Sequence, residues 1–287
     1  QGFVVYIKRR MDIATENNQD KMIGYFDFFG MPDGIVSNTV WFDENYKIVF
    51  LKEGRVNVDF VDYDFEESTL LFFSIGQQFK ISKNSEGSIV YFNPNFYCIA
   101  FHDKELACDG LLFDNVFELP FIALTAHQRD IFQKILISIK EEIAVKDFWA
   151  EEMIKTYIKQ VVIFATRTLA KKDYDIYHPV SFDKELARKF SQLVEQNYRT
   201  IHSVADYASM LNLTPKNLNR KIVTEKQIAP NTIIKNRIIL QAKRLLVNTT
   251  LSIKEIAVYL GYEDYSYFLR FFKLQTGSSP LTFRNSM

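Results

Sequence analysis

The part of the chain that decides the fold is residues 237–284, which read RIILQAKRLLVNTTLSIKEIAVYLGYEDYSYFLRFFKLQTGSSPLTFR. Apolar residues recur here at helical spacing between turn residues, without the alternation typical of strands. The segment 231–246 predicts one helix, roughly 25 Å long at 1.5 Å per residue. Further helices are expected near 182–197, 203–211, 215–222, 252–259, 264–275 and 280–285. Everything after Ser181 is therefore expected to be helical.

A weak internal repeat, with a period of about 50 residues, runs through this region. Residues 204–208 (VADYA) match residues 253–257 (IKEIA), and residues 211–213 (LNL) match residues 260–262 (LGY). With one residue inserted, the match continues from Leu218, Arg220, Ile222 and Pro230 to Phe268, Arg270, Phe272 and Pro280. The repeat predicts two copies of one helical unit.

Each copy has the parts of a helix-turn-helix. A small residue stands where the next helix must approach closely, and a residue that tolerates positive φ stands at the turn. These residues are Ala208 with Asn212, and Ala257 with Gly261. Thr214 in the first copy, and Glu263 or Asp264 in the second, can cap the following helix. That helix is expected to turn a polar face toward a DNA major groove and to bury Leu218 with Ile222, or Phe268 with Phe272.

Charge is unevenly distributed along the chain, although the formal net charge is zero. From Ser181 to Met287 there are 16 lysines and arginines against 8 aspartates and glutamates. The remaining 180 residues hold 19 against 27. A basic C-terminal third on an acidic body is typical of a domain that binds a polyanion. Spacing and charge together favour DNA binding over a helical module without a nucleic-acid role.

On these residues the sequence resembles the AraC/XylS family of transcription regulators. The resemblance is clear over about residues 195–285, and the family signature matches 237–284. The fixed points of the signature in this chain are Ala242, Leu245, Leu246, Ile253, Ile256, Ala257, Gly261, Tyr262, Phe268, Arg270, Phe272, Lys273, Gly277, Pro280 and Arg284. One departure is Gln227, where the first unit of the family usually has glycine, as Gly277 is in the second. We expect the bend after the first recognition helix to differ for this reason.

The resemblance implies that bases are read from exposed positions of each second helix. These positions are Lys216, Asn217, Asn219 and Arg220 in the first unit, and Tyr265, Ser266, Leu269 and Arg270 in the second. Arginine can bond guanine, asparagine can pair with adenine, and an apolar side chain can meet the thymine methyl group. Phosphate contacts are expected from Lys221, Lys243, Lys254 and Lys273. Plainer interpretations stay open: solvated lysines, and arginines that hold phosphates or pair inside the fold.

Residues 36–118 are predicted to be β structure. Apolar runs at 48–61, 69–76, 79–82 and 88–94 are separated by Gly, Asn and Pro, and Glu53-Gly54 divides the first run as in a hairpin. Short strands of this kind indicate a sandwich or a small barrel. Two amphipathic helices are expected next, from Thr125, which can cap, to about 145, and from about 148 to 171. The polar segment 173–181, which contains Pro179, is the predicted linker.

Members of the resembled family with this layout have a cupin-like β-barrel followed by two helices; the barrel often binds a small effector and the helices often dimerise. The resemblance therefore implies an α+β protein with a C-terminal all-α domain of two helix-turn-helix units. Its domains would be a sensing and dimerisation domain at 1–172 (barrel about 20–120, helices about 125–171), the linker 173–181, and the DNA-binding domain 182–287. Apolar residues beyond the core-facing stripes of the two helices predict a homodimer interface, although a larger internal core explains them equally well. They are Ile137, Val145, Phe148, Trp149, Ile163 and Phe164.

The rival class is an enzyme, a metal-binding cupin with a helical tail. The histidines His102, His127, His178 and His202 are isolated from one another, and no His-x-His pair with a later Glu and His supplies a metal set. We interpret them as surface or linker groups. No G-x-x-x-x-G-K phosphate loop is present, and no Ser-His-Asp motif is visible, although such a set can assemble in space. We expect no catalytic residue, no metal and no cofactor.

The sequence thus predicts a cytoplasmic transcription regulator that is not an enzyme. We expect it to bind double-stranded promoter DNA, to contact RNA polymerase, and to activate rather than repress. No membrane contact is expected, since no segment reaches the roughly 18 apolar residues of a span, and Cys98 with Cys108 fits a reducing cytosol. Two forms of control stay open: a small-molecule effector in the barrel, and a protein partner acting on an empty barrel.

Overall fold

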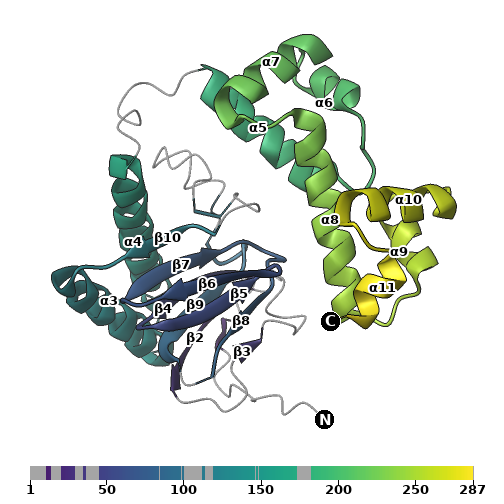
Figure 1. The fold of residues 1–287 in the computed structure, drawn as a ribbon. Coiled ribbons are helices and arrows are strands. Elements are labelled where there is room, and N and C mark those ends of the chain that lie inside the picture. The colour runs from purple at the N-terminus through teal and green to yellow at the C-terminus, as the bar shows by residue number, and fades with distance from the viewer. Residues whose placement is uncertain are drawn as a thin grey trace. The chain divides into compact units, whose positions relative to one another are not determined.

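The computed structural model of the chain describes residues 11–13, 21–29, 35–36, 45–83, 85–97, 99, 112–113, 119–145, 147, 149–172 and 182–286 (Figure 1). The chain divides into two compact units, Gln1–Tyr177 and His178–Met287. The predicted linker 173–181, both cysteines, His102 and His178 lie outside the described residues. Among the residues that are described, no helix is long and apolar enough to cross a membrane.

Two antiparallel sheets form the β part of the first unit. The six-stranded sheet has the order β1 (Met11–Ile13), β2 (Lys21–Phe29), β9 (Glu86–Phe92), β4 (Tyr46–Leu51), β7 (Thr69–Phe73) and β10 (Phe121–Ala123). The four-stranded sheet has the order β3 (Ile35–Val36), β8 (Phe79–Ile81), β5 (Gly54–Val58) and β6 (Val61–Phe65). A double β layer followed by helices confirms the predicted α+β fold class.

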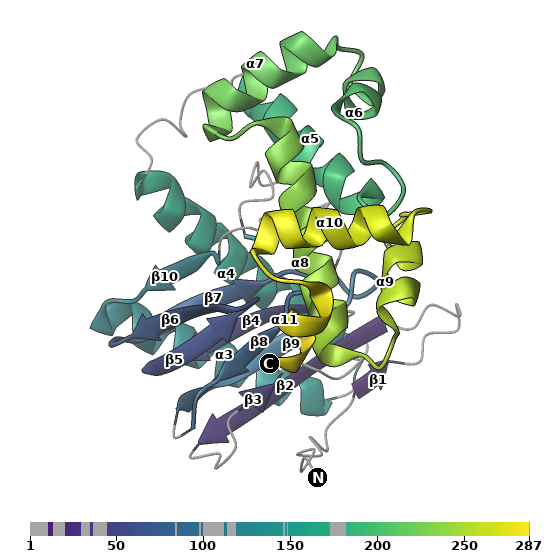
Figure 2. The same ribbon diagram turned by 45° about the vertical axis from the view of Figure 1, so that its right-hand side comes forward.

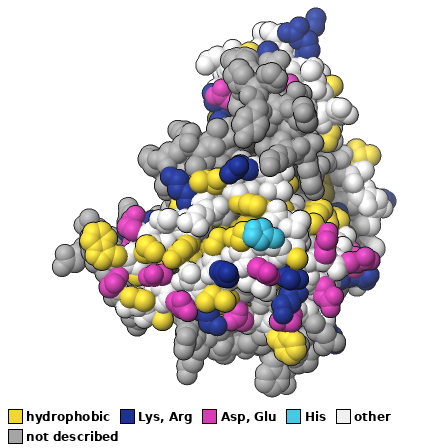
Figure 3. Space-filling model, turned by 90° about the vertical axis from the view of Figure 1, so that its left-hand side faces the viewer, with side chains coloured by type: hydrophobic (Ala, Val, Ile, Leu, Met, Phe, Trp, Pro, Cys, Tyr) yellow, Lys and Arg dark blue, Asp and Glu magenta, His cyan; other side chains and the backbone are white. Residues whose placement is uncertain are grey.

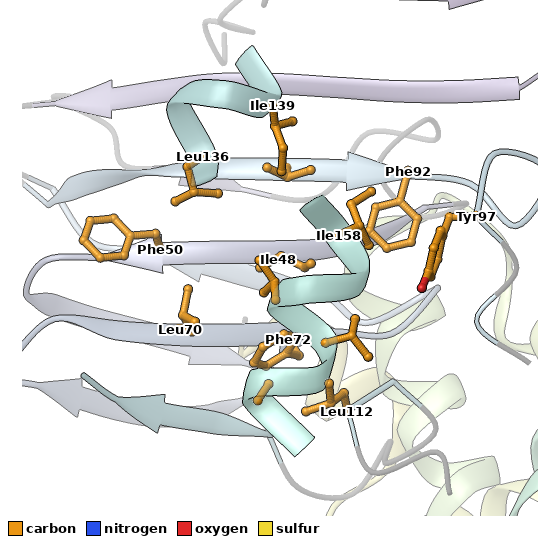
Figure 4. Close-up of a cluster of buried hydrophobic side chains, with 14 of the residues drawn as sticks. Ile48, Phe50, Leu70, Phe72, Phe92, Tyr97, Leu112, Leu136, Ile139 and Ile158 are labelled. Carbon is orange, nitrogen blue, oxygen red and sulfur yellow. The ribbon is translucent and has the colours of Figure 1, made fainter. Parts of the chain in front are cut away.

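The six-stranded sheet is buried on both faces. Successive side chains of a strand point to opposite faces, so Val49 and Leu51 of β4 pack toward the four-stranded sheet, with Val56 and Phe79. The residues between them, such as Phe50, pack toward two long helices (Figure 4). This double burial explains why the run from Ile48 to Leu51 is continuously apolar.

The hairpin predicted at Glu53-Gly54 is wrong. β4 pairs with β7 and β9, whereas β5 pairs with β6 and β8, so the chain crosses between sheets at this point. Both edges of β4 are already occupied by neighbours, which leaves no edge for β5. The hairpin instead joins β5 to β6 through Asp59 and Phe60, which have φ values of 48° and 73°.

Helices α3 (Ala126–Val145) and α4 (Ala150–Lys172) cover the outer face of the six-stranded sheet. As predicted, Thr125 caps α3: its hydroxyl accepts from the Gln128 amide at 3.4 Å, and Gln128 accepts from the Thr125 amide at 2.9 Å. Phe132 of α3 packs edge-on against Phe164 of α4. Leu136 and Ile139 of α3 and Ile158 of α4 point at the sheet (Figure 4).

The second unit is helical throughout its described residues, as predicted (Figure 2). It contains α5 (Phe182–Asn197), α6 (Val204–Met210), α7 (Pro215–Lys226), α8 (Pro230–Asn248), α9 (Ile253–Tyr259), α10 (Tyr265–Thr276) and α11 (Pro280–Asn285). Pro230 and Pro280 each begin a helix, where the missing amide proton costs nothing. One continuous hydrophobic core contains residues of α5 through α10.

Candidate nucleic-acid interface

The helix pairs α6–α7 and α9–α10 are joined by turns of the same geometry. Asn212 and Gly261 occupy the turns with φ values of 56° and 78°, the left-handed region that the sequence predicts for them. The next amide donates back to the small residue of the first helix in both copies. Leu213 bonds the Ala208 carbonyl at 2.8 Å, and Tyr262 bonds the Ala257 carbonyl at 2.9 Å.

The second helix of each pair begins with a side-chain cap. The Thr214 hydroxyl accepts from the Asn217 amide at 3.3 Å. In the second unit the cap is Asp264 rather than Glu263, and its carboxylate accepts from the Ser266 and Tyr267 amides at 2.7 and 3.2 Å. Both predicted caps are thus confirmed, and the starting points of α7 and α10 correspond.

The burial of α7 and α10 follows the same pattern at positions 50 residues apart. Leu218 and Ile222 are fully buried in α7, as Phe268 and Phe272 are in α10. Arg220 and Arg270 each follow the first buried residue by two positions, about 200° around the helix. Both arginines are exposed and therefore project from the face opposite the core.

The predicted base-reading positions are mostly at the surface. Lys216, Asn217, Asn219 and Arg220 of α7 are exposed, as are Tyr265, Ser266 and Arg270 of α10. Leu269 is half-buried on the flank of α10. Within residues 182–286, neither Arg220 nor Arg270 has an ion-pair partner, so the interpretation that they pair inside the fold has no support there.

The predicted phosphate contacts differ from one another. Lys254 and Lys273 are exposed. Lys221 is half-buried, and the corresponding residue of the second unit, Phe271, is buried. Lys243 is also half-buried, with its ammonium nitrogen 5.5 Å from the centroid of the Phe283 ring. Lys254 and Lys273 are therefore the best placed of the four for a phosphate.

Sequence reasoning missed Tyr267, which is 55% exposed on α10. Its counterpart 50 residues earlier is Asn217, a predicted base-reading position, so the repeat itself carried the signal. The Tyr267 ring stacks on Tyr262 with centroids 5.9 Å apart. This contact fixes its direction at the beginning of the helix.

The expected difference in the bend after the first recognition helix is not found. Gln227 ends α7 with a φ of 54°, and Gly277 ends α10 with a φ of 79°. Each donates its amide to the carbonyl four residues earlier, at 2.9 Å in both cases. Ile222 before it and Pro230 after it are both buried, and Gln227 between them adopts the conformation that glycine adopts more readily.

A buried arginine that the sequence did not single out joins α5 to α8. Arg237 is 3% exposed; its guanidinium bonds both carboxylate oxygens of Glu195, one at 2.7 Å, and lies 3.8 Å from the centroid of the Tyr198 ring. Burial alone would lower the pKa of Arg237, but the bonds and charge of Glu195 raise it above its ordinary value. The middle of α8 is thereby fixed on the last turns of α5.

A second arginine binds the C-terminal end of α8. Arg284 of α11 donates to the carbonyls of Leu246 at 2.9 Å and Leu251 at 2.7 Å. These carbonyls lie at the end of α8 and in the loop before α9, where helical bonding stops. Arg284 therefore has a structural role within the second unit.

Two of the histidines lie in the described residues. His127 is exposed, as expected, but the surface interpretation is wrong for His202, which is half-buried with its ring 4.8 Å from that of Tyr262. Burial lowers the pKa of His202 below its ordinary value of 6.5, although the Leu260 and Tyr198 backbones oppose the shift. No group of three potential metal ligands occurs in the part of the chain that the structure describes.

Comparison with known proteins gives a family match at the same residues. The sequence profile of the family described as "Helix-turn-helix domain" matches residues 207–286. The uncharacterized HTH-type transcriptional regulator YfiF of Bacillus subtilis is 29% identical over 133 residues, which are 46% of this chain and 40% of that protein's length. The arabinose operon regulatory protein of Salmonella typhimurium is 24% identical over 272 residues, 91% of this chain and 88% of that protein.

Among solved structures, ToxT from Vibrio cholerae is similar at 16% identity, covering 91% of this chain and 97% of that one with a TM-score of 0.47.

Proposed function

We propose that this chain, whose residues 207–286 form a helix-turn-helix domain of the AraC/XylS type, is a transcription regulator that reads promoter DNA through two major-groove helices. The observation that carries the proposal is the equivalence of Arg220 and Arg270. Each is exposed on the polar face of the second helix of its unit, directly opposite a buried residue. A domain evolved for packing alone has no need of two matching cationic faces.

The proposal assigns base contacts to the exposed faces of α7 and α10. On α7 they are Lys216, Asn217, Asn219 and Arg220. On α10 they are Tyr265, Ser266, Tyr267, Leu269 and Arg270, a face that is richer in aromatic and apolar groups and better suited to thymine methyl groups. Lys254 and Lys273 are assigned to phosphates, with Lys221 in a lesser role.

The length of α8 supports simultaneous binding. Its 19 residues span about 28 Å. α7 precedes the beginning of α8 and α9 follows its end (Figures 1 and 2). Adding the half-widths of α7 and α10 brings this distance to the scale of one turn of B-DNA, about 34 Å. Two successive major grooves on one side of the duplex are therefore within reach.

The basic charge of the compact C-terminal part of the chain, residues 178–287, gives the first test. Binding of the full chain to duplex DNA should weaken steeply as salt rises, since each neutralised phosphate contributes about −0.9 to the slope of log affinity against log salt. Lys273→Ala should reduce the slope by about one and weaken all sequences equally. The exposed Lys189, which pairs with Glu185 on α5, provides a control that should leave the slope unchanged. A flat slope for the unaltered chain would refute the proposal.

The finer parts of the function concern the compact N-terminal part of the chain, residues 1–177. We propose that the protein forms a homodimer through the exposed apolar side chains of α3, of α4 and of Trp149 between them, namely Ile131, Ile137, Val145, Trp149 and Met153. Hydrophobic side chains form a band among charged ones on the face of the molecule that carries these helices (Figure 3). Of the other residues expected at this interface, Phe164 packs against Phe132, Ile163 is half-buried, and Phe148 lies outside the described residues.

The proposal also includes activation through contact with RNA polymerase, in the cytoplasm where bacterial promoter DNA lies, and control by a small-molecule effector bound in the first unit. A reporter gene behind the natural promoter distinguishes activation from repression. Thermal-shift measurements on the full chain with a panel of sugars and carboxylic acids test the effector, because a ligand of the folded state raises Tm. Control by a protein partner is the outcome favoured if no compound raises it.

A further inference from the structure

The loop that follows α5, residues 198–202, contacts both helix-turn-helix units. On the side of the first unit, the hydroxyl of the buried Tyr207 on α6 donates to the Ile201 carbonyl at 3.0 Å. The Tyr207 ring also packs edge-on against Phe190 of α5. The loop is therefore attached to the core of the first unit.

On the opposite side, Arg199 reaches the second unit. Its guanidinium lies 3.8 Å from the centroid of the Tyr259 ring, and its Nε donates to the Tyr259 carbonyl at 3.3 Å. The Arg199 carbonyl rests against the turn between α9 and α10: a Cβ on Gly261 would lie 2.1 Å from that oxygen. The turn of the second unit thus requires glycine for contact with the loop 198–202 as well as for its φ.

His202 extends this contact to the recognition helix of the second unit. Its ring packs against Tyr262, and Tyr262 in turn packs against Phe268 and Tyr267 at the beginning of α10, with ring centroids 5.3 and 5.9 Å apart. At the start of the loop, Tyr198 stacks under Arg237 of α8. Four of the five loop residues, all except Thr200, therefore contact the first unit, the connecting helix or the second unit.

We propose that residues 198–202 form a clasp that fixes the direction of α10 relative to α7, with Arg199 and His202 as positioning residues that make the protein selective for one spacing of its two DNA half-sites. This inference rests on the proposed DNA binding. A shift of one base pair turns a half-site by roughly 34–36° around the duplex axis. A rigid pair of recognition helices cannot follow that rotation, whereas two units joined by α8 alone could bend at its ends.

The rigidity can be measured without DNA. Spin labels are placed on Val223→Cys of α7 and Gln275→Cys of α10, both exposed positions, in the full chain with Cys98 and Cys108 changed to serine. Electron–electron double resonance should give one narrow distribution of the distance between the two spin labels. Arg199→Ala and Arg199→Lys should both broaden it, because lysine keeps the charge but cannot stack and bond as the planar guanidinium does. Lys189→Ala should leave it narrow. Equal widths in the parent and in Arg199→Ala, with unchanged circular dichroism, would overturn the clasp.

DNA binding supplies the second readout. A duplex selected by the unaltered protein is compared with duplexes that have one base pair inserted or removed between the half-sites. The affinity of the parent for the altered duplexes should be lower by about tenfold or more than its affinity for the selected duplex. For both Arg199 variants, the same ratio of affinities should be less than half of the parent's ratio. If Arg199 only meets a phosphate, Arg199→Lys will behave as the parent and the clasp is wrong. If the parent binds no DNA while the distance result holds, the proposed function fails and the rigid arrangement stands.

Discussion

Gln227 and Gly277 end the two recognition helices in the same left-handed conformation, although only glycine adopts it without a steric penalty. Both amides bond the carbonyl four residues earlier at 2.9 Å, so the turns are equivalent in hydrogen bonding as well. The fold therefore imposes the turn on the first unit at the expense of its stability. The second unit has the residue type that the conformation favours.

We predict that Gln227→Gly stabilises the compact C-terminal part of the chain, residues 178–287, and that Gly277→Gln destabilises it, each by about 1 kcal/mol. A Cβ at position 277 would meet no atom within 4 Å, so the backbone conformation alone is responsible for the effect there. Urea unfolding of residues 178–287, followed by circular dichroism, measures both changes; we expect this fragment to fold because its core is internal. A less stable Gln227→Gly variant would contradict the interpretation.

The buried pair of Arg237 and Glu195 should matter more than an exposed pair on the same helix. Glu195→Gln leaves a buried guanidinium without its counter-charge, and we expect a loss of about 3 kcal/mol, the lower end for buried pairs because Glu195 is itself partly exposed. Glu185→Gln, which removes the exposed partner of Lys189, should cost at most about 1 kcal/mol. Similar losses in the two variants, measured by urea unfolding, would show that Arg237 is satisfied without Glu195.

Most of the helical C-terminal part, residues 178–287, could be predicted from the sequence because its signals are local. Caps at Thr214 and Asp264 and turns at Asn212 and Gly261 depend on residues within a few positions. The contacts of Arg199 with Tyr259 and of Arg237 with Glu195 join residues 60 and 42 positions apart, and no local pattern marks them. The fifty-residue repeat also indicates Tyr267 as a base-reading position, because it corresponds to Asn217, but the sequence analysis did not use this correspondence.

The N-terminal part, residues 1–177, was harder to predict because its strands pair with partners that are far away in the sequence. The Glu53-Gly54 signal is a good hairpin signal locally, yet β4 is an inner strand with β9 and β7 on its two sides. The real hairpin turns at Asp59 and Phe60, and phenylalanine at a φ of 73° has no sequence signature. β2, which pairs with β9 over seven residues, precedes the range 36–118 in which strands were predicted, although the barrel itself was expected from about residue 20.

Acid should lower the free energy of unfolding of the C-terminal part of the chain, residues 178–287, through His202. Burial lowers the pKa of this histidine in the folded state, so below its ordinary value of 6.5 the unfolded chain takes up a proton more readily than the folded one. Its contribution is unchanged above that pH and is lost as pH falls through the window below 6.5. Tyr262, whose ring packs against His202, is neutral in this window because a phenol has an ordinary pKa of 10.0, and burial raises that pKa further.

The check compares the free energy of unfolding at pH 7.5 and pH 5.5 for the parent fragment and for His202→Asn. The parent should lose more stability between the two values than the variant does. His127→Asn, at an exposed position of the first unit, is the matched control in the full chain. An identical pH dependence in the parent and in His202→Asn would exclude this role for His202.

The dimer is tested by charge introduced into the apolar surface formed by α3, α4 and the residue Trp149 between them. Trp149 is 67% exposed, and Trp149→Asp with Ile137→Asp should convert the protein to a monomer without unfolding it. Val61→Asp, at an exposed apolar position on β6, should keep the dimer. Sedimentation at tens of micromolar is the measurement. A monomeric parent, with and without DNA, would end the dimer proposal.

The central claim is that two equivalent helices read two separate half-sites, and base preference measured for single arginine variants tests it most directly. Duplexes selected from a random library by the full chain give the preferred base at each position, and the selection is repeated with Arg220→Ala and with Arg270→Ala. We predict that each variant relaxes the preference in only one half-site, at a cost of about 1–3 kcal/mol there, with the two affected positions about 10 base pairs apart. Loss of affinity that is uniform across all sequences in both variants, with the fold intact, would contradict the claim and leave the arginines as backbone contacts.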